Sequence, residues 1–136
     1  MADAKISQLT AVTTLDGTEP LPVVQSNTTK KATVSQILTG QLVTESGTTR
    51  TLSATDNGKI IYCTSSSAVT INCAAGLGVG FNCTIIQGGT GKVTVAANSQ
   101  TLVSYSSLFS TMGQYAVISL VCPVADTFVA AGNLGV

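Results

Sequence analysis

The residue types that most often carry out catalysis are scarce in this chain. It contains no histidine, so neither a Ser-His-Asp nor a Cys-His arrangement can form within one copy. The acidic residues fall in segments typical of an arm or of turns, where solvated roles are far more common than general acid or base catalysis. They are Asp3, Asp16, Glu19, Glu45, Asp56 and Asp126. The sequence therefore predicts a protein that is not an enzyme.

One glycine-rich loop superficially resembles a phosphate-binding loop, Gly88-Gly89-Thr90-Gly91. A phosphate-binding loop leads into a helix and ends in a lysine followed by a hydroxyl residue, and this loop has neither feature. We interpret it as the turn of a β-hairpin over Gly80 to Val95, in which the glycines supply positive φ values. We expect no bound cofactor.

Four cysteines lie in apolar or alternating segments, Cys63, Cys73, Cys83 and Cys122. The shortest spacing leaves nine residues between two of them, whereas zinc sites use close pairs such as C-x-x-C. Their even number leaves disulfides as an alternative, but the opening Met-Ala-Asp-Ala-Lys-Ile has no apolar core typical of a secretion signal. We expect buried, reduced thiols and no metal.

Charged residues are unusually few. They make up 9% of the 136 residues, against roughly 25% in ordinary soluble proteins, and the mean hydropathy is +0.43. The net charge is zero and Lys30-Lys31 is the only adjacent basic pair, so a nucleic-acid partner is not expected. The longest apolar run, Tyr115 to Val121, is too short to span a membrane. Much of the surface is therefore expected to be covered by other subunits.

From Arg50 onward the chain alternates short β-like runs with turn signals, among them Asp56-Asn57-Gly58, a strong hairpin signal. We expect strands at 51–55, 59–64, 68–73, 81–87, 92–97, 101–105, 115–122 and 127–131. This pattern predicts an all-β fold, an antiparallel β-sandwich or barrel-like module over residues 49–136. Some strands, such as Ile60-Ile61-Tyr62, are apolar on both faces, which suggests that another copy or another protein closes one face.

Residues 1–48 have a different character. Pro20 and Pro22 fix an extended path and exclude a central strand. A short helix near 33–39 is expected, with Thr33 as N-cap, Gln36 completing a capping box and Gly40 beyond its end. The sequence thus predicts an extended N-terminal arm with one short helix.

The order of the motifs resembles a known class of proteins. In the arm the motifs are Lys5-Ile6-Ser7-Gln8-Leu9, Leu15-Asp16-Gly17-Thr18-Glu19, Leu21-Pro22-Val23-Val24-Gln25 and Thr29-Lys30-Lys31-Ala32-Thr33-Val34-Ser35-Gln36-Ile37. In the β module they are Thr51 through Lys59, Gly80-Phe81, Ile86-Gln87-Gly88, Gly91-Lys92-Val93 and Gly132-Asn133-Leu134. Together they are similar to tailed-bacteriophage virion structural proteins, a class that includes decoration proteins, head fibres and tail fibres. Such modules tend to carry a Trp where this chain has Phe128.

The resemblance implies a non-enzymatic homotrimer whose arm attaches to a capsid or tail protein. The short chain favours a capsid cement or decoration protein, bound to the major capsid protein on the outer surface of a virion assembled in the host cytoplasm. The expected contacts with the capsid or within the trimer are Ile6, Leu9, Leu15, Leu21, Val23, Val24, Val34, Ile37 and Leu38. The alternatives are a tail-fibre or tail-adaptor protein, and a module that binds host glycans by stacking tyrosine rings on sugars. Tyr62 and Tyr115 are expected in strand cores, and only Tyr105 in a loop.

Overall fold

The computed structural model describes residues 20–33 and 41–136. The chain divides into two compact units, Met1–Thr39 and Gly40–Val136. The helix expected near 33–39 lies outside the described residues, except for Thr33, which is the last residue of a strand.

The described part of the N-terminal unit is a β-hairpin of β1 (Pro20–Gln25) and β2 (Thr28–Thr33). Ser26 and Asn27 form its two-residue turn, with φ values of 51° and 57° typical of a type I′ turn. In an antiparallel hairpin, residue pairs that exchange backbone hydrogen bonds alternate with pairs that do not. Counted from the turn, Pro20 and Pro22 fall in pairs without hydrogen bonds, where no backbone N–H is needed. The extended path expected of Pro20 and Pro22 is that of β1, and its pairing with β2 was not predicted from the sequence.

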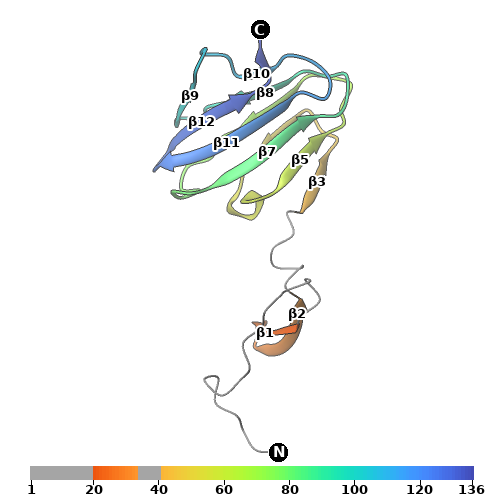
Figure 1. The fold of residues 1–136 in the computed structure, drawn as a ribbon, viewed down its shortest axis with the longest axis vertical. Helices are drawn as coiled ribbons and strands as arrows, with labels where there is room; N and C mark the ends of the chain where they lie inside the picture. Colours follow the sequence, from red (N-terminus) through yellow and green to blue (C-terminus); the bar gives the residue numbers. More distant parts are fainter. Residues whose placement is uncertain (1–19, 34–40) are drawn as a thin grey trace, which may run out of the picture. The chain divides into compact units, whose positions relative to one another are not determined.

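The body contains two sheets (Figure 1). The six-stranded sheet has the order β3 (Leu42–Glu45), β5 (Ile60–Cys63), β7 (Asn82–Gln87), β11 (Val117–Val124), β12 (Thr127–Gly132) and β9 (Thr101–Ser104). The five-stranded sheet has the order β13 (Leu134–Gly135), β10 (Ser110–Thr111), β8 (Val93–Ala96), β6 (Val69–Asn72) and β4 (Thr49–Thr51).

From β3 to β8 the chain alternates between the two sheets. We call each successive pair of strands, one in each sheet, a coil, and the three coils are β3 with β4, β5 with β6 and β7 with β8. Strands of successive coils pair in parallel. In one sheet β3 pairs with β5 and β5 with β7, and in the other β4 pairs with β6 and β6 with β8. In the body, residues 41–136, antiparallel pairs occur only where β11, β12, β10 and β13 complete the two sheets, and β9 joins β12 in parallel. The all-β prediction is confirmed, but the antiparallel pattern is wrong. The arrangement is solenoid-like.

The expected hairpin over Gly80 to Val95 does not form, because β7 and β8 belong to different sheets. The glycines between them do not have positive φ. They let the loop stack on the loop of the preceding coil: a Cβ on Gly89 would lie 2.1 Å from the Ser65 carbonyl oxygen, and one on Gly91 would lie 1.9 Å from that of Ser67. Close backbone approach, rather than a tight reversal, explains these glycines.

The Asp56-Asn57-Gly58 turn, which the sequence suggested as a hairpin, also connects strands of different sheets. The strand expected at 51–55 is the end of β4, and Ala54–Asp56 is a short 3₁₀ helix. Gly58, with φ of 72°, then turns the chain toward β5 in the other sheet. The remaining expected strands are present as β5, β6, β7, β8, β9, β11 and β12.

One hydrophobic core receives buried residues from both sheets. Alternate residues point inward, as in β7, where Cys83 and Ile85 are buried and Thr84 between them is half-buried. Phe81 and Phe128 meet edge to face in this core, with ring centroids 6.3 Å apart. Phe128 therefore occupies a fully buried position in the last long strand.

Replacing Ile85 with Asp should prevent folding. Ile85 is fully buried, and an unpaired carboxylate in this core costs several kcal/mol against a total stability of about 5 to 15 kcal/mol. Thr70→Asp on the outward face of β6 is the matched control and should stay folded. Circular dichroism during urea unfolding compares the two, and a cooperative transition in Ile85→Asp at the wild-type midpoint would contradict this account of the core.

Candidate functional site

A network of charged residues occupies the first coil of the body. Arg50 lies at the inward position of β4 and Glu45 at the inward position of β3, where the following coils carry Ile71 and Cys63. The third member, Asp56, ends the 3₁₀ helix and is only 1% exposed. The charges therefore occupy the end of the hydrophobic core.

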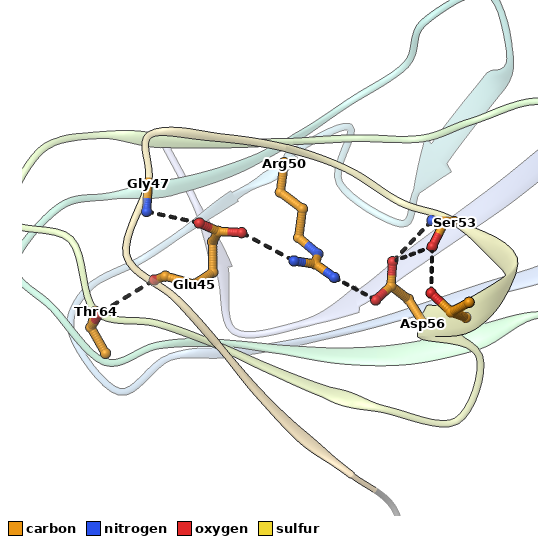
Figure 2. A network of polar contacts seen from close by, with 7 residues as sticks. Glu45, Gly47, Arg50, Ser53, Asp56 and Thr64 are labelled. Atoms are coloured by element: carbon orange, nitrogen blue, oxygen red, sulfur yellow. Dashed lines mark hydrogen bonds and ion pairs between the residues drawn. The ribbon is translucent and has the colours of Figure 1, made fainter.

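Arg50 holds both carboxylates (Figure 2). One terminal nitrogen donates to Glu45 Oε2 at 3.1 Å and the other to Asp56 Oδ1 at 2.6 Å. The other oxygen of Glu45 accepts a hydrogen bond from the Gly47 N–H at 2.8 Å. Within the part of the chain that the structure describes, the Arg50 Nε has no hydrogen-bond partner.

Asp56 is held in its ionised form. Burial raises its pKa, but the Ser53 N–H at 2.9 Å, the Ser53 hydroxyl and the Arg50 guanidinium together bring the pKa below its ordinary value of 3.8. Burial also opposes the charge on Arg50, yet its two carboxylate partners raise its pKa. Sequence reasoning assigned Glu45 and Asp56 to solvated turns. That is wrong, since Asp56 is buried and both carboxylates form ion pairs with Arg50.

The cysteines lie in the core as free, buried thiols. Burial raises the pKa of Cys63 and Cys73 to about 11 and that of Cys83 to about 12, so these thiols are neutral at ordinary pH. Among residues 20–33 and 41–136 there is no group of three or more His, Cys, Asp or Glu residues able to hold a metal ion.

Two of the three tyrosines are well exposed. Tyr105, in the turn after β9, is fully exposed, and Tyr115 is 68% exposed with a positive φ of 66°. The expectation that Tyr115 lies in a strand core is wrong, because it precedes β11 in a turn. Tyr62 lies partly buried against Gly88, where a Cβ would come within 2.6 Å of its ring and hydroxyl. Gln114 donates to the Gly88 carbonyl oxygen at 2.7 Å.

The outer face of the six-stranded sheet carries many hydrophobic side chains and no charged one. We call it the apolar face, and it is formed by the outward residues of the six strands. Its hydrophobic members are Leu42, Ile60, Tyr62, Ile86, Val103, Val117, Val121, Val129 and Ala131. Its polar members are Thr44, Asn82, Thr84, Thr101, Ser119 and Thr127. Over these strands no charged side chain points outward, because Glu45 faces the core.

Of the expected arm contacts, three lie in β1. Leu21 is 41% exposed, and Val23 and Val24 pair through their backbones with Lys30 and Thr29. The remaining six, Ile6, Leu9, Leu15, Val34, Ile37 and Leu38, lie outside the described residues. Sequence reasoning noted strands that are apolar on both sides, but without the register it could not assemble them into the apolar face.

Among the described residues no helix is long and apolar enough to cross a membrane. Comparison with protein-family models and with curated proteins found no match.

Replacing Arg50 with Met should destabilise the body by about 3 kcal/mol, because it leaves the buried Asp56 carboxylate without its counter-charge. Glu45→Gln, at the more accessible carboxylate, is the control and should cost about 1 kcal/mol or less. Urea unfolding measures both changes, and equal losses would contradict the central place of Asp56.

The same pair predicts a pH dependence. Because the pKa of Asp56 is lower in the folded state, its ion pair with Arg50 adds to the free energy of unfolding. This stabilisation is complete above the ordinary pKa of 3.8 and is lost as the pH falls through the lower pKa of the folded protein. Asp56→Asn should remove this part of the acid dependence.

Proposed function

We propose that this chain is a structural protein of a tailed-phage virion, a homotrimeric cement or decoration protein bound to the outer surface of the capsid. Support comes from the resemblance of its motifs, their order along the chain, and the division into an N-terminal unit and a β body. The observation that carries the proposal is the apolar face, since a broad uncharged sheet surface serves contact with protein rather than chemistry.

In this proposal the N-terminal unit grips the major capsid protein. Ile6, Leu9, Leu15, Leu21, Val23 and Val24 bury apolar area on the shell, and Val34, Ile37 and Leu38 serve the shell or the trimer. Burial of apolar area contributes roughly 25 cal/mol per Å2 to the binding free energy. Repeated over many copies on the shell, this binding would oppose the pressure of the packaged genome without catalysis. A tail-fibre or tail-adaptor protein would use the same two parts against a tail protein.

Host-glycan binding is the second candidate. The exposed rings of Tyr105 and Tyr115 favour it, since an accessible aromatic face with polar neighbours suits stacking against a sugar. Ser104, Ser106 and Ser107 surround Tyr105 in the sequence.

Removing residues 1–39 should abolish decoration of the shell while the body stays folded, because the hydrophobic core lies entirely within the second unit. The measurement is cosedimentation with capsids from a phage lacking the gene for this protein, alongside circular dichroism of the free variant.

Full occupancy by the truncated protein would contradict attachment through the N-terminal unit. Electron microscopy of virions labelled with an antibody separates the locations, since label on the tail alone would favour the tail alternative.

A glycan array tests the second candidate. The cement proposal expects no binding by the isolated protein, whereas glycan recognition expects binding that falls at least tenfold in Tyr105→Ala or Tyr115→Ala. Thr49→Ala, on the outward face of β4, is the control. Signal that both tyrosine variants retain would contradict recognition through these rings.

A further inference from the structure

The two sheets differ sharply in the residues they turn outward. The outward positions of the five-stranded sheet are mostly polar, namely Thr49, Thr51, Thr70, Asn72, Thr94, Ala96 and Ser110. Those of the six-stranded sheet form the apolar face. Threonine is a good strand former and already occupies the polar side, so β-propensity does not require Ile, Val and Tyr on the other. The difference indicates that water covers one sheet and protein covers the other.

The strand register joins the hydrophobic residues of the apolar face into rows. Tyr62 lies beside Ile86, which lies beside Val117. A second row continues across the sheet from Val121 to Val129 and Val103. Val103 and Val121 are 42% and 39% exposed, so these rows are open to a partner.

The occupant that this surface fits is a second copy of the same chain. A partner with ordinary charge density would lose hydration of its charges against a face that offers no counter-charge. Two copies of an uncharged face meet without that cost. Six strands at about 4.8 Å spacing and 4 to 8 residues in length give roughly 500 Å2 of flat area per copy. Two copies together would bury about 1,000 Å2, close to the smallest total area of a specific interface.

We propose that the apolar face is the surface through which copies of this chain associate with one another. This deepens the proposed function and rests on it in one respect, since a decoration protein built from several copies needs a subunit interface. The five-stranded sheet then keeps its polar face toward solvent.

The test is analytical ultracentrifugation of the full chain and of two double variants over a range of concentrations. Val103→Lys with Val121→Lys places two charges on the apolar face, at positions exposed enough to solvate them in a single copy. It should weaken association at least about a hundredfold, because the charges would be buried without partners. Thr49→Lys with Thr70→Lys makes the same change on neighbouring β4 and β6 and should associate like wild type.

Val103→Thr with Val121→Thr keeps the side-chain shapes and answers the question if the lysine variant does not fold. It should weaken association about tenfold. A wild-type chain that sediments as a single copy, or assemblies that lose as much in the control as in the face variants, would overturn the proposal. A complex of two copies that the face variants dissociate supports this face and contradicts the trimer of the proposed function. Loss of shell binding with self-association intact would fault the proposed function alone.

Discussion

Parallel pairing between successive coils is the constraint on which the rest of the structure depends. When β5 lies on β7 in register, Ile61 lies beside Ile85, and the same stacking sets Ile71 beside Val95 in the other sheet. Inward and outward positions alternate along β5, β6, β7 and β8, so this register decides which residues form the core and which form the two outer faces. A shift by one residue would turn the apolar face inward and the core outward.

Stacked coils leave the core open at its ends, and the first coil closes one end with charge. Arg50 stands where later coils carry an aliphatic residue, and its two carboxylate partners compensate for its partial burial. Such a cluster adds little net stability compared with apolar packing, but it is costly to break. It also brings three of the twelve charged side chains of the chain together in one place.

Local pattern predicted most strands of the body, but it missed β3, β10 and β13 and did not predict how the strands pair. The alternation of Phe81, Cys83 and Ile85 along the sequence matches their burial in the core. The glycines after β7 and the Asp56-Asn57-Gly58 turn suggested hairpins, because a turn that reverses a chain and one that leads it to a second sheet use similar residues. The distinction depends on contacts with the previous coil, such as that of Gly91 with Ser67, which sequence spacing does not reveal. The burial of Asp56 likewise depends on Arg50 reaching it across the first coil.

The coil-by-coil construction has an evolutionary consequence. Because Thr70 pairs with Thr94, and Ile60 with Thr84, one coil is a unit that repeats along the sheets. Duplication of such a unit would lengthen the body while every existing strand kept equivalent neighbours, since each coil touches mainly those before and after it. The ion-paired first coil and the antiparallel last strands would keep their structure at the two ends of the longer body. The fold can therefore accept the insertion or loss of a whole coil without disturbing the packing of the other coils.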